Sequence, residues 1–187
     1  DISTPFSSDQ GVIDLNGIYQ ALKFMPGGVA HGLVFGAGEV LSPGVYDVTG
    51  ATSIDGTLTM DGGGDPNSMF IIRSTGAFTT GATTTNVVLT NGASSNNIFW
   101  LSEQTLSTGA GSVMKGTLVS AAGAIQLGAN TNLEGRMLTR AGALSIGAGS
   151  VLTAPTGTSP FDLGILTSFA MFTSSGTISD TVPTTIT

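Results

Sequence analysis

The sequence has no cysteine and few charged residues. Without cysteine it forms no disulfide, no thiolate metal site and no cysteine nucleophile. Only 9% of the 187 residues are charged, against about a quarter in a typical soluble domain, so Thr, Ser, Asn and Gly must supply most of the surface. With five Lys plus Arg and a formal net charge of −7, the chain lacks the basic footprint that nucleic acid or an anionic membrane requires.

Long apolar runs are also missing. No stretch approaches the ~18 continuous apolar residues of a membrane span, and the best candidate, 163–172, is interrupted by Gly164, Thr167 and Ser168. We therefore expect no membrane insertion. Because the chain begins at Asp1 rather than Met, we expect it to be processed or excised from a longer one. A surface rich in Thr, Ser and Gly and poor in Lys favours a secreted, extracellular or cell-surface protein.

A short repeat runs through the second half of the chain. The segments 105–110 (TLSTGA), 124–129 (AIQLGA) and 143–148 (ALSIGA) align, and their glycines at 109, 128 and 147 are 19 residues apart. Segment 77–82 (AFTTGA) fits the same register, and 51–56 (ATSIDG) fits it loosely. Each unit alternates apolar and polar residues and turns at Gly, which predicts short strands that must stack to bury their apolar side. We expect an all-β-dominated fold, a right-handed-type β-solenoid of about five coils.

A second set of aligned segments predicts which side chains enter the solenoid. We expect an inward ladder of Phe70, Phe99, Leu118 and Met137. Because strand side chains alternate, the next residue of each strand then points outward and needs a cover. These outward residues are Ile71, Trp100, Val119 and Leu138.

One helix is predicted as that cover, over about residues 11–25. Apolar residues from Val12 to Met25 recur at helical spacing, 7–10 (SSDQ) offers a capping box, and 26–28 (PGG) ends the run. Gly17 within it costs stability unless close packing requires it. The helix and solenoid together make a unit over residues 1–160. Residues 161–187 form a second segment with a long alternating strand stretch at 161–179, outside the 19-residue register.

Several short motifs follow one another through residues 12–155. They are 41–46 (LSPGVY), 56–67 (GTLTMDGGGDPN), 70–72 (FII), 88–93 (VLTNGA), 97–100 (NIFW), 115–118 (KGTL) and 133–137 (LEGRM). Together these motifs resemble the microbial ice-binding-protein family. The resemblance implies a discontinuous β-solenoid with a helix alongside, and it implies ice binding.

The order of the chain differs from the family's order at one place. Segment 163–172 (LGILTSFAMF) looks like the family's opening strand, which normally precedes the helix, but here it comes last. The chain therefore resembles a circularly permuted member of the family. Three explanations stay open. The segment completes its own solenoid, it completes a neighbour's solenoid, or the chain is a unit cut out of register from a tandem array or a sequence that is missing a piece.

Candidate chemical sites are weak throughout the sequence. His31 is the single histidine, so a zinc site or a Ser-His-Asp triad lacks its parts. Segment 61–67 (DGGGDPN) suits a calcium loop, but such loops repeat in calcium-binding solenoids and this one occurs once, so we expect a turn. The acidic residues are scattered rather than paired for glycosidase chemistry. We expect no catalysis, no metal and no cofactor.

The remaining candidate site is a column of hydroxyl-bearing side chains that the aligned repeats place on one outward face of the solenoid. Stacked coils repeat at roughly 4.8 Å, so a column of hydroxyls and methyls forms a flat lattice, and the family resemblance implies that such a face orders water and binds ice. The alternative is that Thr and Ser simply make good solvated strand faces. The candidate ice-binding residues are Thr79, Thr83, Thr85, Ser107, Gln126 and Ser145.

Two functions follow. The first is a non-catalytic structural unit that joins other copies head to tail through its C-terminal strand, into an extracellular filament or surface array. The second is an ice-binding module for antifreeze, recrystallisation inhibition or adhesion to ice. The partners are then the chain itself, ice, or both. The residues expected to join subunits are Leu163, Ile165, Phe169 and Met171.

Overall fold

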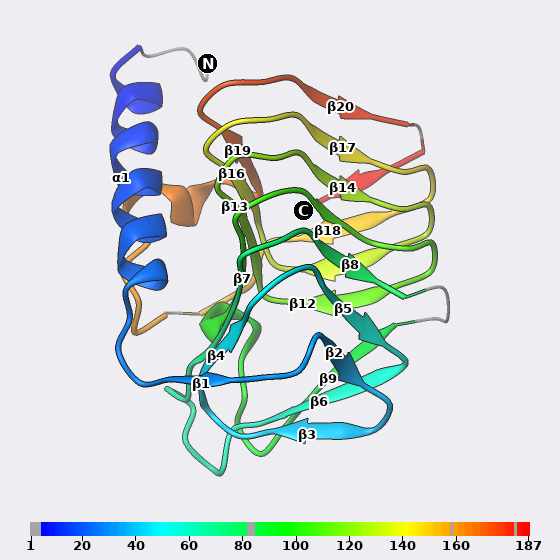
Figure 1. Cartoon of the computed structure of the whole chain (residues 1–187). Helices are drawn as coiled ribbons and strands as arrows, with labels where there is room; N and C mark the ends of the chain where they lie inside the picture. Colours follow the sequence, from blue (N-terminus) through cyan, green and yellow to red (C-terminus); the bar gives the residue numbers. More distant parts are fainter. Residues whose placement is uncertain (1–4, 82–84, 158, 182) are drawn as a thin grey trace.

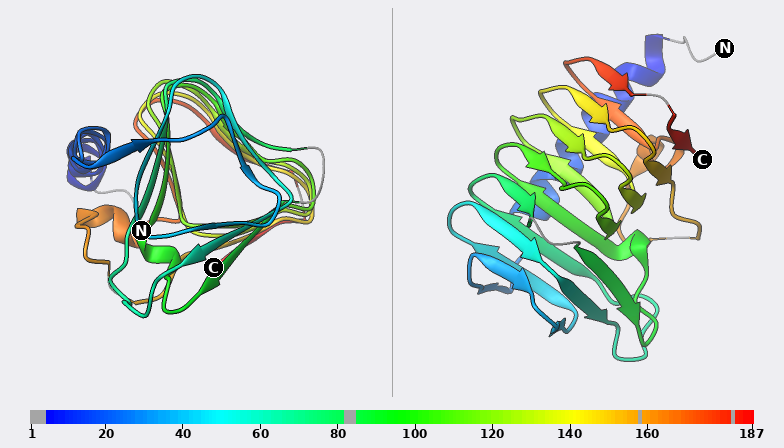
Figure 2. Two further views of the ribbon diagram at one scale, coloured as in Figure 1. Left: turned by 60° about the horizontal axis from the view of Figure 1, so that its bottom comes forward. Right: turned by 90° about the vertical axis from the view of Figure 1, so that its right-hand side faces the viewer.

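The chain winds into a solenoid with a triangular cross-section, and one helix lies beside it (Figures 1 and 2). The computed structural model describes residues 5–81, 85–157, 159–181 and 183–187. Three parallel seven-stranded sheets form the sides of the triangle, which we name sheets A, B and C. Seven coils are therefore present where five were predicted. The last coil was missed because Ser145 and its partner Ser179 are 34 residues apart, outside the 19-residue register. The first coil was missed although Val34 lies 19 residues before its partner Ser53, because 33–35 (LVF) has no apolar–polar alternation.

Each coil contributes one short strand to each sheet, in chain order. Sheet A consists of β1 (Gly28–Ala30), β4 (Gly44–Val48), β7 (Phe70–Ser74), β10 (Ile98–Ser102), β13 (Thr117–Ser120), β16 (Met137–Thr139) and β19 (Met171–Thr173). Sheet B consists of β2 (Val34–Gly36), β5 (Thr52–Asp55), β8 (Phe78–Thr80), β11 (Leu106–Ser107), β14 (Ile125–Leu127), β17 (Leu144–Ile146) and β20 (Ile178–Asp180). Sheet C consists of β3 (Glu39–Leu41), β6 (Thr57–Asp61), β9 (Asn86–Thr90), β12 (Val113–Lys115), β15 (Asn132–Glu134), β18 (Val151–Thr153) and β21 (Thr185–Ile186).

The repeated glycines allow the coils to stack closely at one corner. A Cβ atom at Gly128 would lie 2.6 Å from the carbonyl oxygen of Thr108, and one at Gly147 would lie 2.6 Å from the backbone nitrogen of Ala129. Contacts this short are not compatible with a side chain. The 19-residue glycine spacing therefore records the place where one coil touches the next.

The interior of the solenoid is a ladder of apolar side chains, with one correction to the predicted ladder. Phe70, Leu118 and Met137 belong to the solenoid core as expected. In β10, however, Trp100 points inward and Phe99 points outward, the reverse of the prediction. The pairing of β10 with β13 aligns Trp100 with Leu118. All five residues of β10 are buried, so its sequence carries no alternation from which to read the phase.

Helix α1 (Pro5–Lys23) covers the outward face of sheet A, as predicted. Its buried residues Leu15, Ile18, Tyr19 and Leu22 share a cluster with the outward residues of sheet A, which are Ile71, Phe99, Leu101, Val119 and Leu138. The helix begins at Pro5, before the predicted capping box, because proline fits a first helical turn whose N–H groups have no partner. Within the described part of the chain, no helix has the length and apolar character of a membrane span.

The C-terminal segment forms the last coil on its own chain. Strands β19, β20 and β21 pair with β16, β17 and β18, respectively. The expected long strand at 161–179 is wrong, because Gly164–Ser168 is a 3-10 helix, η2, and regular pairing begins only at Met171. A second 3-10 helix, η1 (Ser95–Asn97), precedes β10.

Candidate functional surface

The outward face of sheet B carries one continuous column of side chains. Strand pairing places Ser107 beside Thr79 on one side and beside Gln126 on the other, and Gln126 beside Ser145. These four residues therefore share the column that the 19-residue repeat predicted. The pairing extends the column by residues that the sequence analysis missed, namely Val34 and Ser53 in the first coils and Ser179 in the last. The loose repeat at 51–56 was the only signal for Ser53.

Two of the predicted face residues need separate treatment. Thr83 lies outside the described residues. Thr85 is fully buried, and its Oγ1 donates a hydrogen bond of 3.0 Å to the carbonyl oxygen of Ile54, so it does not belong to the exposed face. It lies immediately before β9, at the corner where the chain has already turned toward sheet C. A hydroxyl at such a corner satisfies a buried carbonyl instead of facing solvent.

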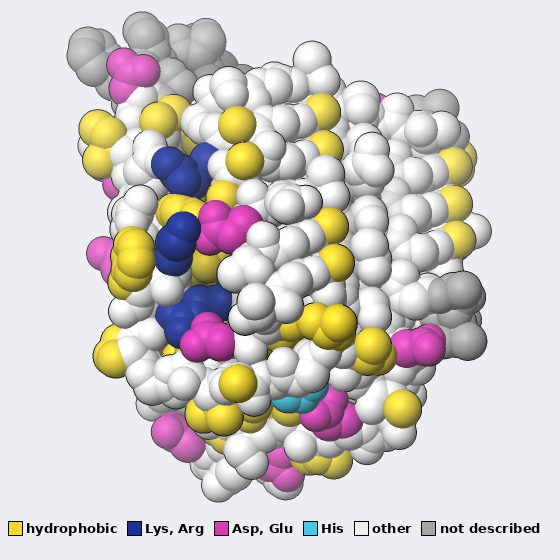
Figure 3. Space-filling model, in the orientation of Figure 1, with side chains coloured by type: hydrophobic (Ala, Val, Ile, Leu, Met, Phe, Trp, Pro, Cys, Tyr) yellow, Lys and Arg dark blue, Asp and Glu magenta, His cyan; other side chains and the backbone are white. Residues whose placement is uncertain are grey.

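The outward column of sheet B carries mostly small polar side chains, and helix α1 does not cover it. Thr79 and Gln126 are exposed, and Ser107 and Ser145 are half-buried between their neighbours. Strand spacing of about 4.8 Å sets the distance between successive members of the column. Figure 3, in which sheet B faces the viewer, shows no Lys or Arg over these strands. Asp55, at the end of β5, marks the border of the column with the next corner.

The other two sheets present different surfaces. Sheet A is covered by α1. Sheet C carries an ion pair on its outward side, with Lys115 Nζ 2.7 Å from Glu134 Oε2. Burial alone would raise the pKa of Glu134, but the hydrogen bonds from Lys115 and Ser95 outweigh it and hold the pKa below its ordinary value. The outward face of sheet C therefore carries a charged, paired column beside the uncharged column of Thr57, Asn86, Val113 and Asn132.

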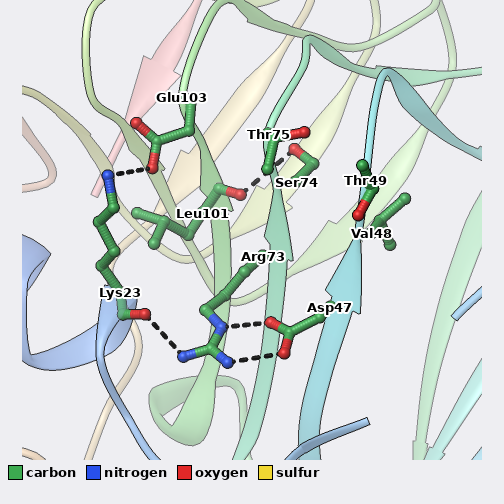
Figure 4. A pocket seen from close by; sticks show the side chains of 9 residues that line it. All are labelled: Lys23, Asp47, Val48, Thr49, Arg73, Ser74, Thr75, Leu101 and Glu103. Atoms are coloured by element: carbon green, nitrogen blue, oxygen red, sulfur yellow. Dashed lines mark hydrogen bonds and ion pairs between the residues drawn. The ribbon is translucent and has the colours of Figure 1, made fainter. Parts of the chain in front are cut away.

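A groove beside the C-terminal end of α1 has a volume of about 280 Å³ (Figure 4). Its charged groups are already paired: Lys23 Nζ lies 2.9 Å from Glu103, and the Arg73 guanidinium lies 2.6 and 2.9 Å from the two Asp47 oxygens. Arg73 also donates to the carbonyl oxygens at the helix end, those of Leu22, Lys23 and Met25. The polar groups of this groove therefore attach the helix to the solenoid. Arg73 supplies the hydrogen bonds that the last carbonyl oxygens of the helix would otherwise lack.

The two remaining sequence candidates have structural roles. In the 61–67 loop, Asp61 Oδ1 accepts the Gly63 N–H at 2.9 Å and both its oxygens accept from Asn91, which together lower the pKa of Asp61 and close a turn. The His31 ring stacks on Phe35 at 3.8 Å and contacts Glu39 at 2.8 Å. Among the described residues, no three His, Cys, Asp or Glu side chains gather as metal ligands would.

Comparison with known sequences agrees with this architecture. Residues 3–153 match the family described as Ice-binding-like. Over 61 residues the chain is 46% identical to Ice-binding protein 1 of Shewanella frigidimarina (strain NCIMB 400), a match that covers 32% of this chain and 7% of that protein. Over 112 residues it is 37% identical to an ice-binding protein of Nostoc sp. (strain HG1), covering 57% of this chain and 41% of that protein.

Solved structures show the same fold. The crystal structure of an ice-binding protein from an Antarctic bacterium of the Flavobacteriaceae superimposes with a TM-score of 0.72 and 36% identity, covering 83% of this chain and 38% of that one. An ice-binding protein from the Antarctic ascomycete Antarctomyces psychrotrophicus gives a TM-score of 0.68 and 26% identity, covering 74% of this chain and 67% of that one. The β-solenoid prediction is confirmed. The chain spans less than half the length of the two sequence relatives and of the bacterial structure.

Proposed function

Because the chain belongs to the ice-binding-like family, we propose that it binds ice through the outward face of sheet B. One observation carries the proposal: consecutive strands place one side chain each, in register, on a face that neither the helix nor an ion pair occupies. The names of its relatives support the ligand. The residues of the proposed face are Ser53, Thr79, Ser107, Gln126, Ser145 and Ser179.

The geometry of this face suits a solid lattice better than a single small molecule. A concave pocket fixes a small ligand through a few convergent groups, whereas the sheet B column is a repeated array with hydroxyl or amide groups about 4.8 Å apart. Each group can hold a water molecule, and a bridging water is nearly as favourable as a direct hydrogen bond. Many such weak contacts made together produce adsorption. Catalysis is not required, and we propose a secreted, non-catalytic protein.

Two bulky substitutions on the column test the proposal. We expect the double variant Thr79→Tyr, Ser145→Tyr to lose at least about tenfold in ice-recrystallisation inhibition, because two protruding rings prevent a flat crystal surface from approaching. The matched control is Thr57→Tyr, Asn132→Tyr. These residues are exposed on the outward column of sheet C, where Asn86 and Val113 link them in register.

The control variant is expected to keep wild-type activity. Circular dichroism of both variants checks that the solenoid is intact. If the sheet C variant loses activity and the sheet B variant keeps it, the face is assigned to the wrong sheet. If the wild-type chain neither inhibits recrystallisation nor enters growing ice, the ice-binding function itself is wrong.

We further propose that copies of the chain join head to tail. In the described part of the chain, each sheet ends in an edge with no further paired strand, with β1, β2 and β3 at one end of the solenoid and β19, β20 and β21 at the other. Both ends expose large apolar side chains. These are Val29 and Leu33 at the first coil and Ile178 and Ile186 at the last. Val34 and Val40 of the first coil are also exposed, on the outward faces of sheets B and C.

The C-terminal segment is the element we propose to exchange between copies. Leu163 is buried against α1 and sheet A of its own chain, with Phe169 packed on the same cluster, while Met171 packs on the solenoid core and Ile165 is half-buried. A segment swapped between identical chains makes the same contacts with its neighbour, so exchange costs little in native contacts. We regard this segment as the family's opening strand in permuted position.

Light scattering of the chain with and without residues 161–187 tests the assembly. We expect a ladder of oligomers for the full chain and a single small species after truncation, because truncation removes the exchanged segment with η2, β19, β20 and β21. An untruncated 187-residue chain that stays at its monomer mass of 18.7 kDa across a hundredfold concentration range contradicts the proposal. Ice binding is measured on the same samples and does not depend on this outcome.

A further inference from the structure

Arg136 is a buried cation without an acidic partner. Arg136 immediately precedes β16 in the chain, and the residue is 4% exposed. One terminal nitrogen donates to the carbonyl oxygen of Thr167 at 3.1 Å, and the other reaches Asn96 Oδ1 only at 3.5 Å. The Nε atom has no hydrogen-bond partner among the residues that the structure describes. No ion pair among the described residues includes this guanidinium, whereas Lys23, Arg73 and Lys115 each contact a carboxylate.

An unpaired guanidinium in this position is energetically costly. A charge removed from water is destabilising unless an opposite charge or a full set of hydrogen bonds replaces the solvent. Burial lowers the pKa of Arg136, and no neighbouring charge acts in the opposite direction. Arginine nevertheless keeps its proton in proteins, so it cannot escape the cost by becoming neutral. Among the described residues, no carboxylate lies within ion-pair distance of this guanidinium to offset the cost.

A cavity of about 310 Å³ lies beside this guanidinium. Arg136 and Asn96 line it from the solenoid, and Ser159, Phe161, Asp162 and Thr167 line it from the segment that leads through η2. Asp162 and Thr167 are exposed, so the cavity reaches the surface. Ser159 Oγ accepts the Phe161 N–H at 3.1 Å, which leaves its own proton available to an acceptor inside the cavity.

We propose that this cavity binds a small oxyanion, with Arg136 as its principal donor and the Ser159 hydroxyl as a second. Guanidinium carries five N–H donors in a planar fork that matches carboxylate, phosphate and sulfate oxygens. Only two of its nitrogens reach protein acceptors. The bound anion supplies the missing charge and ties η2 to the solenoid, so it stabilises the folded chain in proportion to its occupancy.

Asp162 provides a second, independent test of the proposal. Its carboxylate lines the same cavity while its Oδ1 accepts the Gly164 N–H at 2.8 Å. An anion in the cavity is repelled by this like charge. Asp162→Asn keeps an oxygen for Gly164 and removes the charge, so it is expected to tighten anion binding by about threefold.

Isothermal titration of the full chain with sodium sulfate, phosphate and acetate, in chloride buffer of constant ionic strength, tests the site. We expect saturable binding with a dissociation constant on the order of 1 mM, lost in Arg136→Met and retained in the control Arg140→Met. Arg140 bonds to Asn16 and stacks on Tyr19, away from the cavity. Saturation by sulfate and phosphate alone assigns a tetrahedral anion, and saturation by acetate assigns a carboxylate.

Sulfate also stabilises proteins without binding a site, but that effect does not saturate and is shared by every variant. Absence of saturable binding in the wild-type chain overturns the proposal, as does an unchanged dissociation constant in Arg136→Met. Should Arg136→Met fail to fold, the comparison of the wild-type chain with Asp162→Asn decides: equal dissociation constants place the anion elsewhere and overturn the proposal. None of these outcomes depends on ice binding.

Discussion

Individual polar residues hold the helix to the solenoid. The Tyr19 hydroxyl donates to Glu103 at 2.7–2.8 Å, and Lys23 Nζ lies 2.9 Å from the same carboxylate. Burial alone would raise the pKa of Glu103, but the hydrogen bonds from Lys23 and Tyr19 outweigh it, and the pKa falls below its ordinary value. The same contacts raise the pKa of Lys23. All three groups therefore keep their ordinary protonation state at neutral pH.

The lowered pKa of Glu103 makes part of the stability pH-dependent. A carboxylate with a depressed folded-state pKa contributes stability above its unfolded pKa, about 4.3, and loses it as pH falls through the folded value. We expect Glu103→Gln to lower the free energy of unfolding by about 1 kcal/mol at pH 7, and the gap to the wild-type chain to close below about pH 4. Urea unfolding at stepped pH measures both. A gap independent of pH would mean that the charge of Glu103 contributes nothing.

Within helix α1, two glycines have opposite environments. A Cβ atom at Gly17 would meet nothing within 4 Å, so close packing does not explain this glycine. A Cβ atom at Gly11 would lie 2.7 Å from Cε2 of Phe172, a residue of the last coil. The close approach between helix and solenoid occurs at Gly11, six residues before the position at which the sequence suggested it.

Alanine substitution distinguishes the two positions. We expect Gly17→Ala to raise the free energy of unfolding by up to about 1 kcal/mol, because alanine is the better helix former and meets no neighbour. Gly11→Ala is the matched comparison, and it is expected to lower stability because the Phe172 ring must move. Thermal unfolding of the two variants gives the signs directly. Equal effects would show that the helix lies differently against sheet A.

At the scale of the whole molecule, the proposed ice face is an uncharged column on an acidic protein. The chain carries a formal net charge of −7, but the column from Ser53 to Ser179 contains no ionisable side chain. Fields from charges more than about 10 Å away are screened at 0.1 M salt. Asp55 and Asp180 lie at the border of the column, within this distance of it. Adsorption should therefore depend little on charges other than these two.

Salt dependence checks this separation. Ice-affinity partitioning at about 20 and about 200 mM sodium chloride, a range over which charge screening strengthens, is expected to change the bound fraction by less than about twofold. A severalfold loss of binding at the higher concentration would indicate a charged contact surface. The Lys115–Glu134 column of sheet C would then be the surface to test next.

The 19-residue repeat by itself determined much of this molecule. Wherever one face of a strand is apolar and the other is polar, alternation and the glycine spacing specify both register and direction, and so Thr79, Ser107, Gln126 and Ser145 were aligned correctly. The apolar spacing of residues 12–25 likewise identified a helix that needs a covered surface. These features are local, so the sequence records them directly.

Only the tertiary structure decided the rest. Under α1 both faces of sheet A are buried, so β10 has no polar face to show which of its side chains point inward. The predicted orientations of Trp100 and Phe99 were therefore the reverse of the observed ones. Thr85 and Arg136 are polar by composition but buried, because chain corners and the loop before η2 enclose them. The final coil lacks the repeat and is held by pairing with β16, β17 and β18. Burial and pairing depend on neighbours distant in the chain, and no local pattern specifies those.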